Sequence, residues 1–528
     1  MPILYQDRTG ISLYDAQFAS GSRGPISAEI MQAVVNRLLQ FKTTCADFGV
    51  PDENIYVLAT EATRTAPNST EFRELIQERV GWGVRMLSKE DEGRIGALGV
   101  ASSSTRIAGL VMDLGGGSTQ ITWLIEEEGV VTTSPRGSFS FPYGAAALKQ
   151  RLEGGKKKKV MKELREEMDR NFQDAYAQLE LPGKLLDAAK EKGGLDLYLC
   201  GGGFRGWGYL LMEQSSSAKP YPIPIINGYR ASRKECHAMV STAEDVADSE
   251  MKVFGVSKRR ATQIPAVAVL VDVLMETLPG IKHVQFCQGG VREGILFDIL
   301  PVEVRRQDPL LAATMPYAPP SAEAIWDLLW SALPTSPAPS TSSAVPGSFS
   351  GNLISALANL LFVHSSVSKE TRAAAALHCT TTGILATANS LSHTDRALLA
   401  LILCERWGAD LASADQNLQI RLRQCVSSQE AWWCQYLGRV ATLIGDVYPS
   451  GRVSQTGWRI RLATEWDSIT KKKETGDLLR LKVQRNKNND SQLAMMDSLK
   501  EGAESIEKAG KKKNWIQESG VRVGVDVS

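Results

Sequence analysis

The chain has 528 residues, of which 43% are apolar and 23% are charged, and its formal net charge is +1. This composition is typical of a globular protein and excludes a disordered tail or a membrane channel, while the length predicts two to four domains. A balance so close to neutrality offers no general attraction to nucleic acid or to an anionic membrane, so we expect neither as a partner.

The cysteines and the start of the chain indicate where the protein works. The eight cysteines form no C-x-x-C pair and the five histidines do not cluster, which indicates reduced thiols. Residues 1–8 lack the basic flank and apolar stretch of a signal peptide, and no later apolar run approaches the ~20 residues needed to span a bilayer. We therefore expect a soluble, cytoplasmic protein.

From residue 26 to about 126, amphipathic helices alternate with short apolar strands, which is the pattern of an α/β layer structure. Ser27 is positioned to cap a helix over 29–41, whose apolar residues recur at helical spacing. The elements that follow are a strand at 55–59, a helix at 70–80, a strand at 84–87, a helix that begins after Ser88 and a strand at 107–112.

The helix after Ser88 carries Gly93, Gly96 and Gly99. Glycine lowers helix stability, so three glycines at a spacing of three indicate a helix face that another backbone passes closely. Further strands are predicted at 121–125, 195–199 and 284–286, and glycine-rich turns follow the last two of them at 201–206 and 288–294.

The second half of the chain changes character. Residues 334–351 are rich in Pro, Ser and Thr and have too few apolar groups to pack, which predicts a flexible linker. Beyond it, weak alternation in the tail from about 456 predicts a small β-containing cap. Between the two, helical periodicity predicts an all-helical unit with helices at 353–361, 371–385, 394–407 and 414–424.

The strand at 107–112 runs into the sequence Asp-Leu-Gly-Gly-Gly-Ser-Thr-Gln at 113–120. Glycines let backbone amides approach an anion closely, and Asp113 is placed to hold a divalent metal. The alternative interpretation is a tight turn that is glycine-rich for steric reasons alone. Because the acid and the hydroxyls stand where phosphate chemistry needs them, we predict phosphate binding by Gly115, Gly116, Gly117, Ser118 and Thr119.

Four motifs occur in a characteristic order. They are Ala-Thr-Glu-Ala-Thr-Arg-Thr-Ala-Pro-Asn at 59–68, Ser-Lys-Glu-Asp-Glu-Gly-Arg at 88–94, the triple-glycine loop, and Val-Arg-Glu-Gly at 291–294. This order resembles the exopolyphosphatase and guanosine-pentaphosphate phosphatase (Ppx/GppA) family, a branch of the actin-like ATPase fold. Within the family, the resemblance is strongest to the fungal retrograde-regulation proteins, which also carry long helical C-terminal regions.

The resemblance implies an α/β fold class with two actin-like (ribonuclease H-like) domains. An all-helical HD-like domain without metal ligands and a small C-terminal segment would follow. The expected organisation is an N-terminal α/β phosphatase subdomain without its first strands at 1–110, a second α/β phosphatase subdomain at 111–305, a linker at 306–351, the helical domain at 352–450 and a C-terminal α/β extension at 451–528.

The resemblance also implies roles for single residues. Glu92 corresponds to the catalytic glutamate that activates water, Arg64 to the arginine that contacts the phosphate chain, and Asp113 to a ligand of Mg²⁺. Arg205, on a glycine-rich turn, and Arg292, at a helix start, are weaker candidates for the same ligand. His364, His378 and His393 form no His-Asp pair, so we predict ordinary helix residues there.

The sequence departs from the family pattern at two places. The family loop ends in Ser-Thr-Glu, but this chain has Gln120, which removes a negative charge and should weaken Mg²⁺ binding. The first phosphate loop of the family, Asp-x-Gly-Ser-Asn, does not precede Tyr5. The chain would enter at the family's third strand, 3–13, which leaves the first sheet with an exposed edge. Either the gene model is truncated or phosphate is bound through one loop.

Two main hypotheses follow. The first is a phosphohydrolase that binds a polyphosphate or nucleotide phosphate chain and hydrolyses its terminal phosphoanhydride with Mg²⁺ and Glu92. The second is a regulatory sensor of mitochondria-to-nucleus (retrograde) signalling that hydrolyses little and acts through a protein partner, with a homodimer as a further option. A sugar-kinase or chaperone-type ATPase ranks lower, and a dinucleotide site at 201–206 lower still, because no acidic residue follows at the required spacing.

Overall fold

The computed structural model describes residues 3–18, 22–104, 107–153, 157–215, 218–243, 253–454, 457–471, 474–486 and 496–528. The chain divides into two compact units. Unit 1 comprises Met1–Glu213 and Ile226–Arg306, and unit 2 comprises Gln214–Ile225 and Gln307–Ser528. Within the described ranges, no helix is long and apolar enough to cross a membrane.

Unit 1 begins with a small α/β layer. Its two parallel strands pair in register over three residues each, and two helices pack on them through a core that includes Met31, Phe72 and Trp82. The Ser27 side chain accepts a hydrogen bond from the Ile30 amide, as predicted for a helix N-cap. The elements are β1 (Val57–Ala59), β2 (Val84–Met86), α2 (Ala28–Asp47), α3 (Glu61–Arg64) and α4 (Ser69–Val80).

The strand predicted over 3–13 is wrong. Residues 3–12 form no regular element, and the chain enters α1 (Leu13–Gln17), which is capped by the Ser12 hydroxyl. A strand requires a neighbour with free hydrogen-bonding groups. The sheet beside it contains only the short β1–β2 pair, and residues 4–10 are exposed, so neither hydrogen bonds nor burial would stabilise an extended edge strand here.

The rest of unit 1 is built on a seven-stranded mixed sheet with the order β5-β4-β3-β7-β9-β8, in which β6 also pairs with β4. The β3–β4 pair is antiparallel, whereas β3–β7 and β7–β9 are parallel. Each strand predicted in this region is present. The bounds are β3 (Ala108–Leu114), β4 (Thr119–Glu127), β5 (Val130–Thr133), β6 (Phe139–Phe141), β7 (Leu195–Cys200), β8 (Arg230–Ser232) and β9 (Ile281–Phe286).

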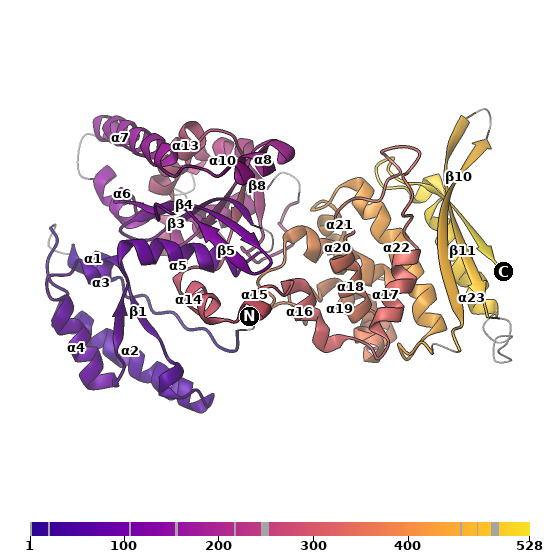
Figure 1. Ribbon diagram of the computed structural model, residues 1–528, viewed down its shortest axis with the longest axis horizontal. Helices are drawn as coiled ribbons and strands as arrows, with labels where there is room; N and C mark the ends of the chain where they lie inside the picture. Colours follow the sequence, from indigo (N-terminus) through magenta and orange to yellow (C-terminus); the bar gives the residue numbers. More distant parts are fainter. Residues whose placement is uncertain are drawn as a thin grey trace. The chain divides into compact units, whose positions relative to one another are not determined.

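Helices cover both faces of this sheet, which explains why β3 and β7 are buried almost throughout. Helices α5 and α14 lie on one side of the sheet and α6, α7 and α13 on the other (Figure 1). The helices are α5 (Lys89–Ala101), α6 (Ala145–Glu153), α7 (Lys157–Gln178), α8 (Gly183–Lys192), α9 (Gly202–Glu213), α10 (Arg233–Val240), α12 (Lys258–Ala261), α13 (Ile264–Thr277), α14 (Val291–Ile299) and α15 (Val302–Arg305).

One of the three glycines of α5, Gly99, lies where another backbone passes, whereas Gly93 and Gly96 face side chains. A Cβ added at Gly99 would lie 2.1 Å from the carbonyl oxygen of Gly290, and one added at Gly294 would lie 1.9 Å from that of Ile95. Gly93 instead faces the side chain of Ser138. Helix α5 therefore crosses the start of α14 at a distance that only glycine permits.

Unit 2 contains a helical part and a three-stranded sheet with the order β10-β11-β12. Its strands are β10 (Ile460–Lys471), β11 (Glu474–Arg485) and β12 (Arg522–Val527). The helices are α16 (Pro309–Thr314), α17 (Ala322–Ser331), α18 (Gly351–Leu360), α19 (Lys369–His378), α20 (His393–Arg406), α21 (Ser413–Arg423), α22 (Ser428–Val447) and α23 (Met496–Ala509).

Two predictions in this half need correction. The segment 306–351 is more than a linker, because α16 and α17 lie within it and Ile325 and Leu329 belong to the hydrophobic core of unit 2; in the stretch predicted to be flexible, 334–351, Phe349 belongs to the same core. Helix α19 ends at His378 rather than at 385, since Gly383 packs against the backbone of Cys379 in a series of turns. The same core continues from α22 into β11, so the helices and the C-terminal sheet share one interior.

The close crossing predicts a specific loss of stability. Gly99→Ala places a methyl group against the backbone of Gly290, which cannot rotate away, so we expect the free energy of unfolding to fall by about 1–3 kcal/mol. Gly206→Ala in α9 is the matched control, because a Cβ there meets nothing within 4 Å. Urea unfolding of both variants is the measurement. Equal midpoints for the two would contradict the proposed crossing.

Candidate functional site

The triple-glycine loop is the turn of the β3–β4 hairpin. The Gly115 amide donates to the Ser118 carbonyl over 3.0 Å and closes the turn. Asp113 on β3 and Gln120 on β4 are direct partners in the antiparallel register, and directly opposite residues project from the same face of a sheet. The two positions that the resemblance associates with a metal are therefore neighbours in space.

The carbonyl groups of the loop are occupied by the start of α6. Amides of Ala145 and Ala146 donate to the carbonyls of Gly115 and Gly116, each over 3.0 Å. The amides at the N-terminus of α6 consequently donate to the loop and are not available to a bound anion. In a simple anion site at a helix N-terminus, these amides would face the anion. In the described part of the chain, the amides of Gly116, Gly117 and Ser118 have no hydrogen-bond acceptor, so the loop presents these three donors.

The hydroxyl groups of the loop point inward. Thr119 is fully buried, and its hydroxyl donates to the backbone carbonyl of Asp113 over 2.7 Å. The Ser118 hydroxyl accepts a hydrogen bond from the Gln120 amide over 2.8 Å, and Ser140 accepts a second one over 3.3 Å. The predicted role of Thr119 as a hydroxyl donor to phosphate is therefore not supported, because that hydroxyl stabilises the turn.

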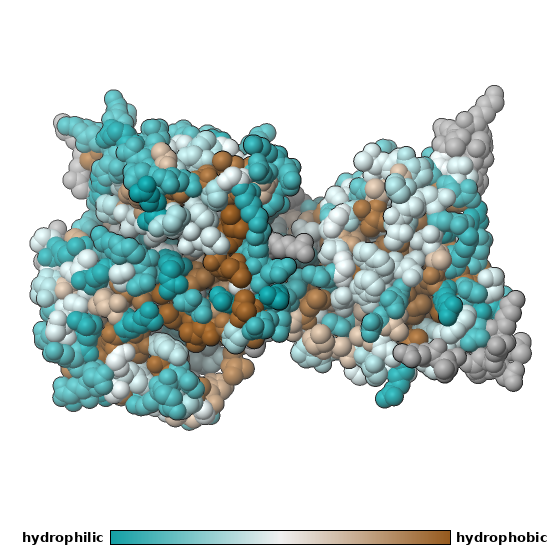
Figure 2. All heavy atoms as spheres, in the orientation of Figure 1, coloured by the Kyte–Doolittle hydropathy of each residue, from teal (hydrophilic) through white to brown (hydrophobic). Residues whose placement is uncertain are grey.

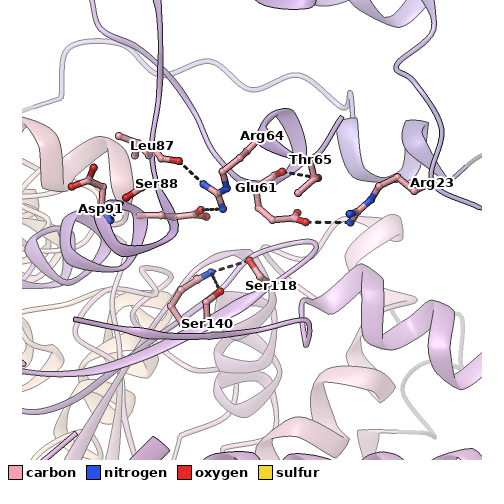
Figure 3. A network of polar contacts seen from close by, with 11 residues as sticks. Arg23, Glu61, Arg64, Thr65, Leu87, Ser88, Asp91, Ser118 and Ser140 are labelled. Carbon is pink, nitrogen blue, oxygen red and sulfur yellow. Dashed lines mark hydrogen bonds and ion pairs between the residues drawn. The ribbon is translucent and has the colours of Figure 1, made fainter. Parts of the chain in front are cut away.

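Arg64 and Glu92 meet although they lie in different elements. Arg64 is the last residue of α3, and Glu92 lies in the first turn of α5, which begins at the N-cap Ser88. The guanidinium donates to the Leu87 carbonyl and to Glu92 Oε2, the latter over 3.0 Å (Figure 3). Their side chains are only 20% and 11% exposed, so this ion pair is largely shielded from water.

The environment of Glu92 raises its pKa. Burial is the largest cause, while the hydrogen bond and charge of Arg64 oppose it and the nearby carboxylates of Asp113 and Glu61 add to it. Burial also raises the pKa of Asp113, against the charge of Arg205. A carboxylate with a raised pKa is suited to accept a proton near neutral pH. Glu92 therefore has the burial and the neighbours that a general base requires.

Glu61 is a site residue that the sequence did not single out. A Cβ added at Gly117 would lie 2.3 Å from Glu61 Oε2, so this carboxylate lies directly against the loop. Its other oxygen pairs with Arg23 over 3.4 Å, and Figure 3 shows the two side chains extended toward each other. The Glu61 carboxylate would repel a phosphate that approaches Gly117. Arg23 pairs with this carboxylate and is the cation that would hold it away from the loop.

A cluster of arginines lies at the start of α9. The Nη2 atom of Arg260 lies 3.2 Å from a Cβ added at Gly202, at the start of this helix. Burial raises the pKa of Tyr209, and the charges of Arg205, Arg8 and Arg260 oppose that rise. Arg205 donates to the carbonyls of Gly201 and Gln288 over 3.2 and 3.3 Å, and no carboxylate pairs with any of the three within the described residues. We call this set the arginine cluster; it adjoins Asp113 through Arg205.

Sequence reasoning found part of this cluster. Arg205 was a candidate because of its glycine-rich turn, whereas Arg8 and Arg260 carry no motif, and arginines are normally surface residues. Arg292, the other weaker candidate, makes a local contact at the start of α14. It is exposed and pairs with Glu293, which in turn accepts a hydrogen bond from the Gly290 amide at the start of α14.

The residues around Asp113 test whether Mg²⁺ fits. No group of three or more His, Cys, Asp or Glu side chains that could hold a metal occurs in the ranges that the structure describes. The neutral Gln120 amide stands opposite Asp113 and donates to two serines. Mg²⁺ is commonly held by one or two carboxylates together with phosphate oxygens, and Asp113 fits only such a shared site.

The histidines of unit 2 form no metal site either. His364 and His393 are buried, and His393 bonds the Tyr221 hydroxyl and the Ile225 carbonyl, each over 2.8 Å. His378 pairs with Asp415 over 2.8 Å at the surface of α19 and α21. His378 and His393 thus have protein partners, and whether any of the three histidines has a further role stays a prediction from the sequence.

The raised pKa of Glu92 predicts how stability depends on pH. Because the pKa in the folded chain lies above its ordinary value near 4.5, ionisation is less favourable in the folded than in the unfolded state. Relative to Glu92→Gln, the wild-type chain should be most stable below pH 4.5 and lose unfolding free energy as the pH rises through the folded pKa. Urea unfolding over a pH series measures this difference.

Glu90, two residues away on the same helix, provides a control of opposite sign. Hydrogen bonds from its own backbone amide and from Ser88 lower its pKa. Relative to Glu90→Gln, the wild-type chain should therefore gain unfolding free energy as the pH rises and lose it in acid. A difference of the same sign at both positions would mean that the burial of Glu92 is misassigned.

Two family models match the chain. The Ppx/GppA phosphatase family matches residues 1–303, and the RTG2 C-terminal domain matches residues 308–528. Among solved structures, the crystal structure of the Aquifex aeolicus Ppx/GppA family member is similar, with 21% identity and a TM-score of 0.40; the match covers 54% of this chain and 85% of that one.

Among relatives, Retrograde regulation protein 2 of Saccharomyces cerevisiae is 38% identical over 490 residues, which are 90% of this chain and 81% of that protein. Exopolyphosphatase 1 of Mycobacterium leprae is 28% identical over 53% of this chain and 77% of its own length. Both the family resemblance of the four motifs and its retrograde-regulation branch are thereby confirmed. The chain belongs to the Ppx/GppA phosphatase family.

Proposed function

We propose that unit 1 binds a phosphate chain, either polyphosphate or the phosphates of a nucleotide. The observation that carries this proposal is the set of open amides at Gly116, Gly117 and Ser118, which the arginine cluster adjoins through Asp113. Charged donors and backbone amides that lack protein acceptors are the groups that bind phosphate oxygens. An extended polyanion would contact the loop amides and the arginine cluster at the same time, whereas a single phosphate would contact only one of these two groups of donors.

Hydrolysis would use Glu92 as the base for a water that attacks the terminal phosphoryl group in line. Arg64 would orient the Glu92 carboxylate and neutralise part of the negative charge of the bound phosphate chain. Mg²⁺ shared between Asp113 and phosphate oxygens would neutralise a further part of that charge. The amide of Gln120 supplies no negative charge to that ion. We therefore infer slow turnover, with binding better developed than catalysis.

The strand order of unit 1 supports the actin-like, ribonuclease H-like fold that the resemblance implies, because three antiparallel strands are followed by two parallel ones in the order β5-β4-β3-β7-β9. In unit 2, the helices from α18 to α22 are assigned to the HD-like class on the resemblance alone. Their histidines have packing partners, so this part of the chain is given a scaffold role and no hydrolytic one.

A second candidate is a regulatory sensor that acts through a protein partner in the cytoplasm. Apolar surface supports it, because Leu296, Ile299 and Val304 on α14 and α15 are 43%, 56% and 43% exposed. Figure 2 shows apolar side chains gathered on unit 1 where Figure 1 places α14. Exposed apolar groups of this kind bind proteins, either a regulatory partner or a second copy of the chain. The relative from yeast is a regulation protein by name.

Phosphate release separates the two functions. The chain is incubated with long-chain polyphosphate or guanosine pentaphosphate and Mg²⁺, beside Glu92→Gln and Gln120→Glu. As an enzyme, the wild-type chain should release phosphate above the Glu92→Gln background, and Gln120→Glu should release more, because a carboxylate at 120 restores a metal ligand opposite Asp113. Equal release by all three would exclude catalysis at Glu92 and leave the sensor function.

The arginine cluster predicts a loss of affinity without a loss of fold. Arg260→Gln removes an unpaired cation, so the dissociation constant for polyphosphate should rise roughly tenfold or more, as for a lost charge-assisted hydrogen bond. Arg259→Gln is the matched control, because that arginine pairs with Asp15 over 2.9 Å. Titration calorimetry measures both. Unchanged affinity in Arg260→Gln would exclude the cluster from the ligand site.

A further inference from the structure

Unit 2 has a cavity of about 420 Å³ that lies apart from the phosphate loop and its motifs. Three stretches of the chain that are far apart in sequence form its walls: the serines of the Pro/Ser-rich segment, the first residues of β11, and the loop between α23 and β12. The lining side chains include Ser340, Ser343, Asp477, Lys512, Trp515 and Arg522. Its volume lies in the range of small-molecule sites.

The first wall is held in place although its composition predicts flexibility. The Gln429 side chain donates to the carbonyls of Thr341, Ser342 and Ala344, and the indole of Trp433 donates to Ala344 as well. The backbone of this segment is therefore fixed against α22. Its serine hydroxyls face β11 in a defined geometry, because a fixed backbone limits the positions they can reach.

Asp477 forms the floor. The hydroxyls of Ser340 and Ser343 both donate to its Oδ2 atom over 2.6 Å, and Ser340 also bonds Ser342 over 3.1 Å. Neither bond uses Oδ1. A carboxylate oriented in this way can accept hydrogen bonds from hydroxyl groups of a ligand, and Glu518, which also lines the cavity, can accept others.

Cations and an aromatic ring form the remaining wall. Lys512 lies over the Trp515 ring, 5.8 Å from its centroid, and Arg522 opens β12. The Nη1 atom of Arg522 is shielded from solvent and has no hydrogen-bond acceptor in the described residues. Because Nη1 is shielded from solvent it does not face the cavity, and Arg522 lines the cavity through its other atoms. Its guanidinium forms no ion pair within the described residues, so an anionic oxygen in the cavity would give this cation a charged partner.

We propose that this cavity binds a small phosphorylated, hydroxyl-rich molecule of the sugar phosphate class. Arg522 and Lys512 bind the phosphate, since a guanidinium and an ammonium are the usual donors to phosphate oxygens. Asp477 and Glu518 accept from the sugar hydroxyls, and the Trp515 ring lies beside the less polar face of the sugar. Unit 2 thereby becomes a ligand-binding unit, and this site does not depend on the function proposed for unit 1.

The test is titration calorimetry of the full chain with glucose 6-phosphate, beside glucose and inorganic phosphate. Saturable binding of glucose 6-phosphate is expected, with a dissociation constant at least roughly tenfold below that of either fragment, because the intact ligand uses both walls. Arg522→Gln and Lys512→Gln should each weaken binding roughly tenfold. Lys512 is exposed, so its replacement leaves the fold intact even if Arg522→Gln does not fold.

Lys482→Gln is the matched control. This lysine lies on the same strand as Asp477, pairs with Glu465 over 2.7 Å and does not line the cavity, so its loss should leave binding unchanged. Absence of saturable binding, or equal affinity in the wild type and in Lys512→Gln, would overturn the proposal. Binding of inorganic phosphate as tight as that of the sugar phosphate would show an anion site only and would overturn the sugar class.

Discussion

The close crossing of α5 and α14 is the constraint on which unit 1 depends. Gly99 and Gly294 let the two helix backbones touch, and the same glycine face brings Gly96 to within 3.7 Å of Asp113 Oδ2, measured from an added Cβ. Helix α5 is thereby fixed over the β3–β4 hairpin. Its first turn, with Glu92, consequently stands beside the phosphate loop and within reach of Arg64 on α3. A larger residue in the crossing would move the base away from the loop.

Charge distribution in unit 1 follows from that placement. Three carboxylates, Glu61, Glu92 and Asp113, gather near the loop, and burial keeps the pKa of the last two raised. Arg64 and Arg23 pair with two of them, and the charge of Arg205 acts on Asp113. The proposed binding of an extended phosphate chain would use this separation of the arginine cluster from the acidic residues.

Unit 2 shows why composition is a weak guide to order. Residues 334–351 have the Pro and Ser content of a linker, yet Phe349 is buried and Gln429 fixes the backbone around Ala344. The segment has few apolar side chains of its own, so its order derives from hydrogen bonds to side chains on α22. The composition of the segment shows that it has few apolar side chains, but it contains no information on hydrogen bonds to side chains of α22.

The sequence by itself determined the elements whose signals are local. Ser27 and Ser88 cap helices, apolar runs become β3, β7 and β9, and the glycine spacing of α5 indicates a close crossing because only glycine permits one. The family followed from motif order, since spacing along the chain survives when most residues change. The phosphate loop was likewise found as a turn between two strands.

Tertiary structure alone decided which groups meet. Residues 3–12 read as a strand, but no neighbour offers them hydrogen bonds, and strand pairing is a property of two segments rather than one. Arg260 came to lie at the glycine-rich turn beside Arg205, and Thr119 turned inward to its own backbone. These outcomes rest on contacts between residues distant in sequence, and no single-residue propensity encodes such contacts.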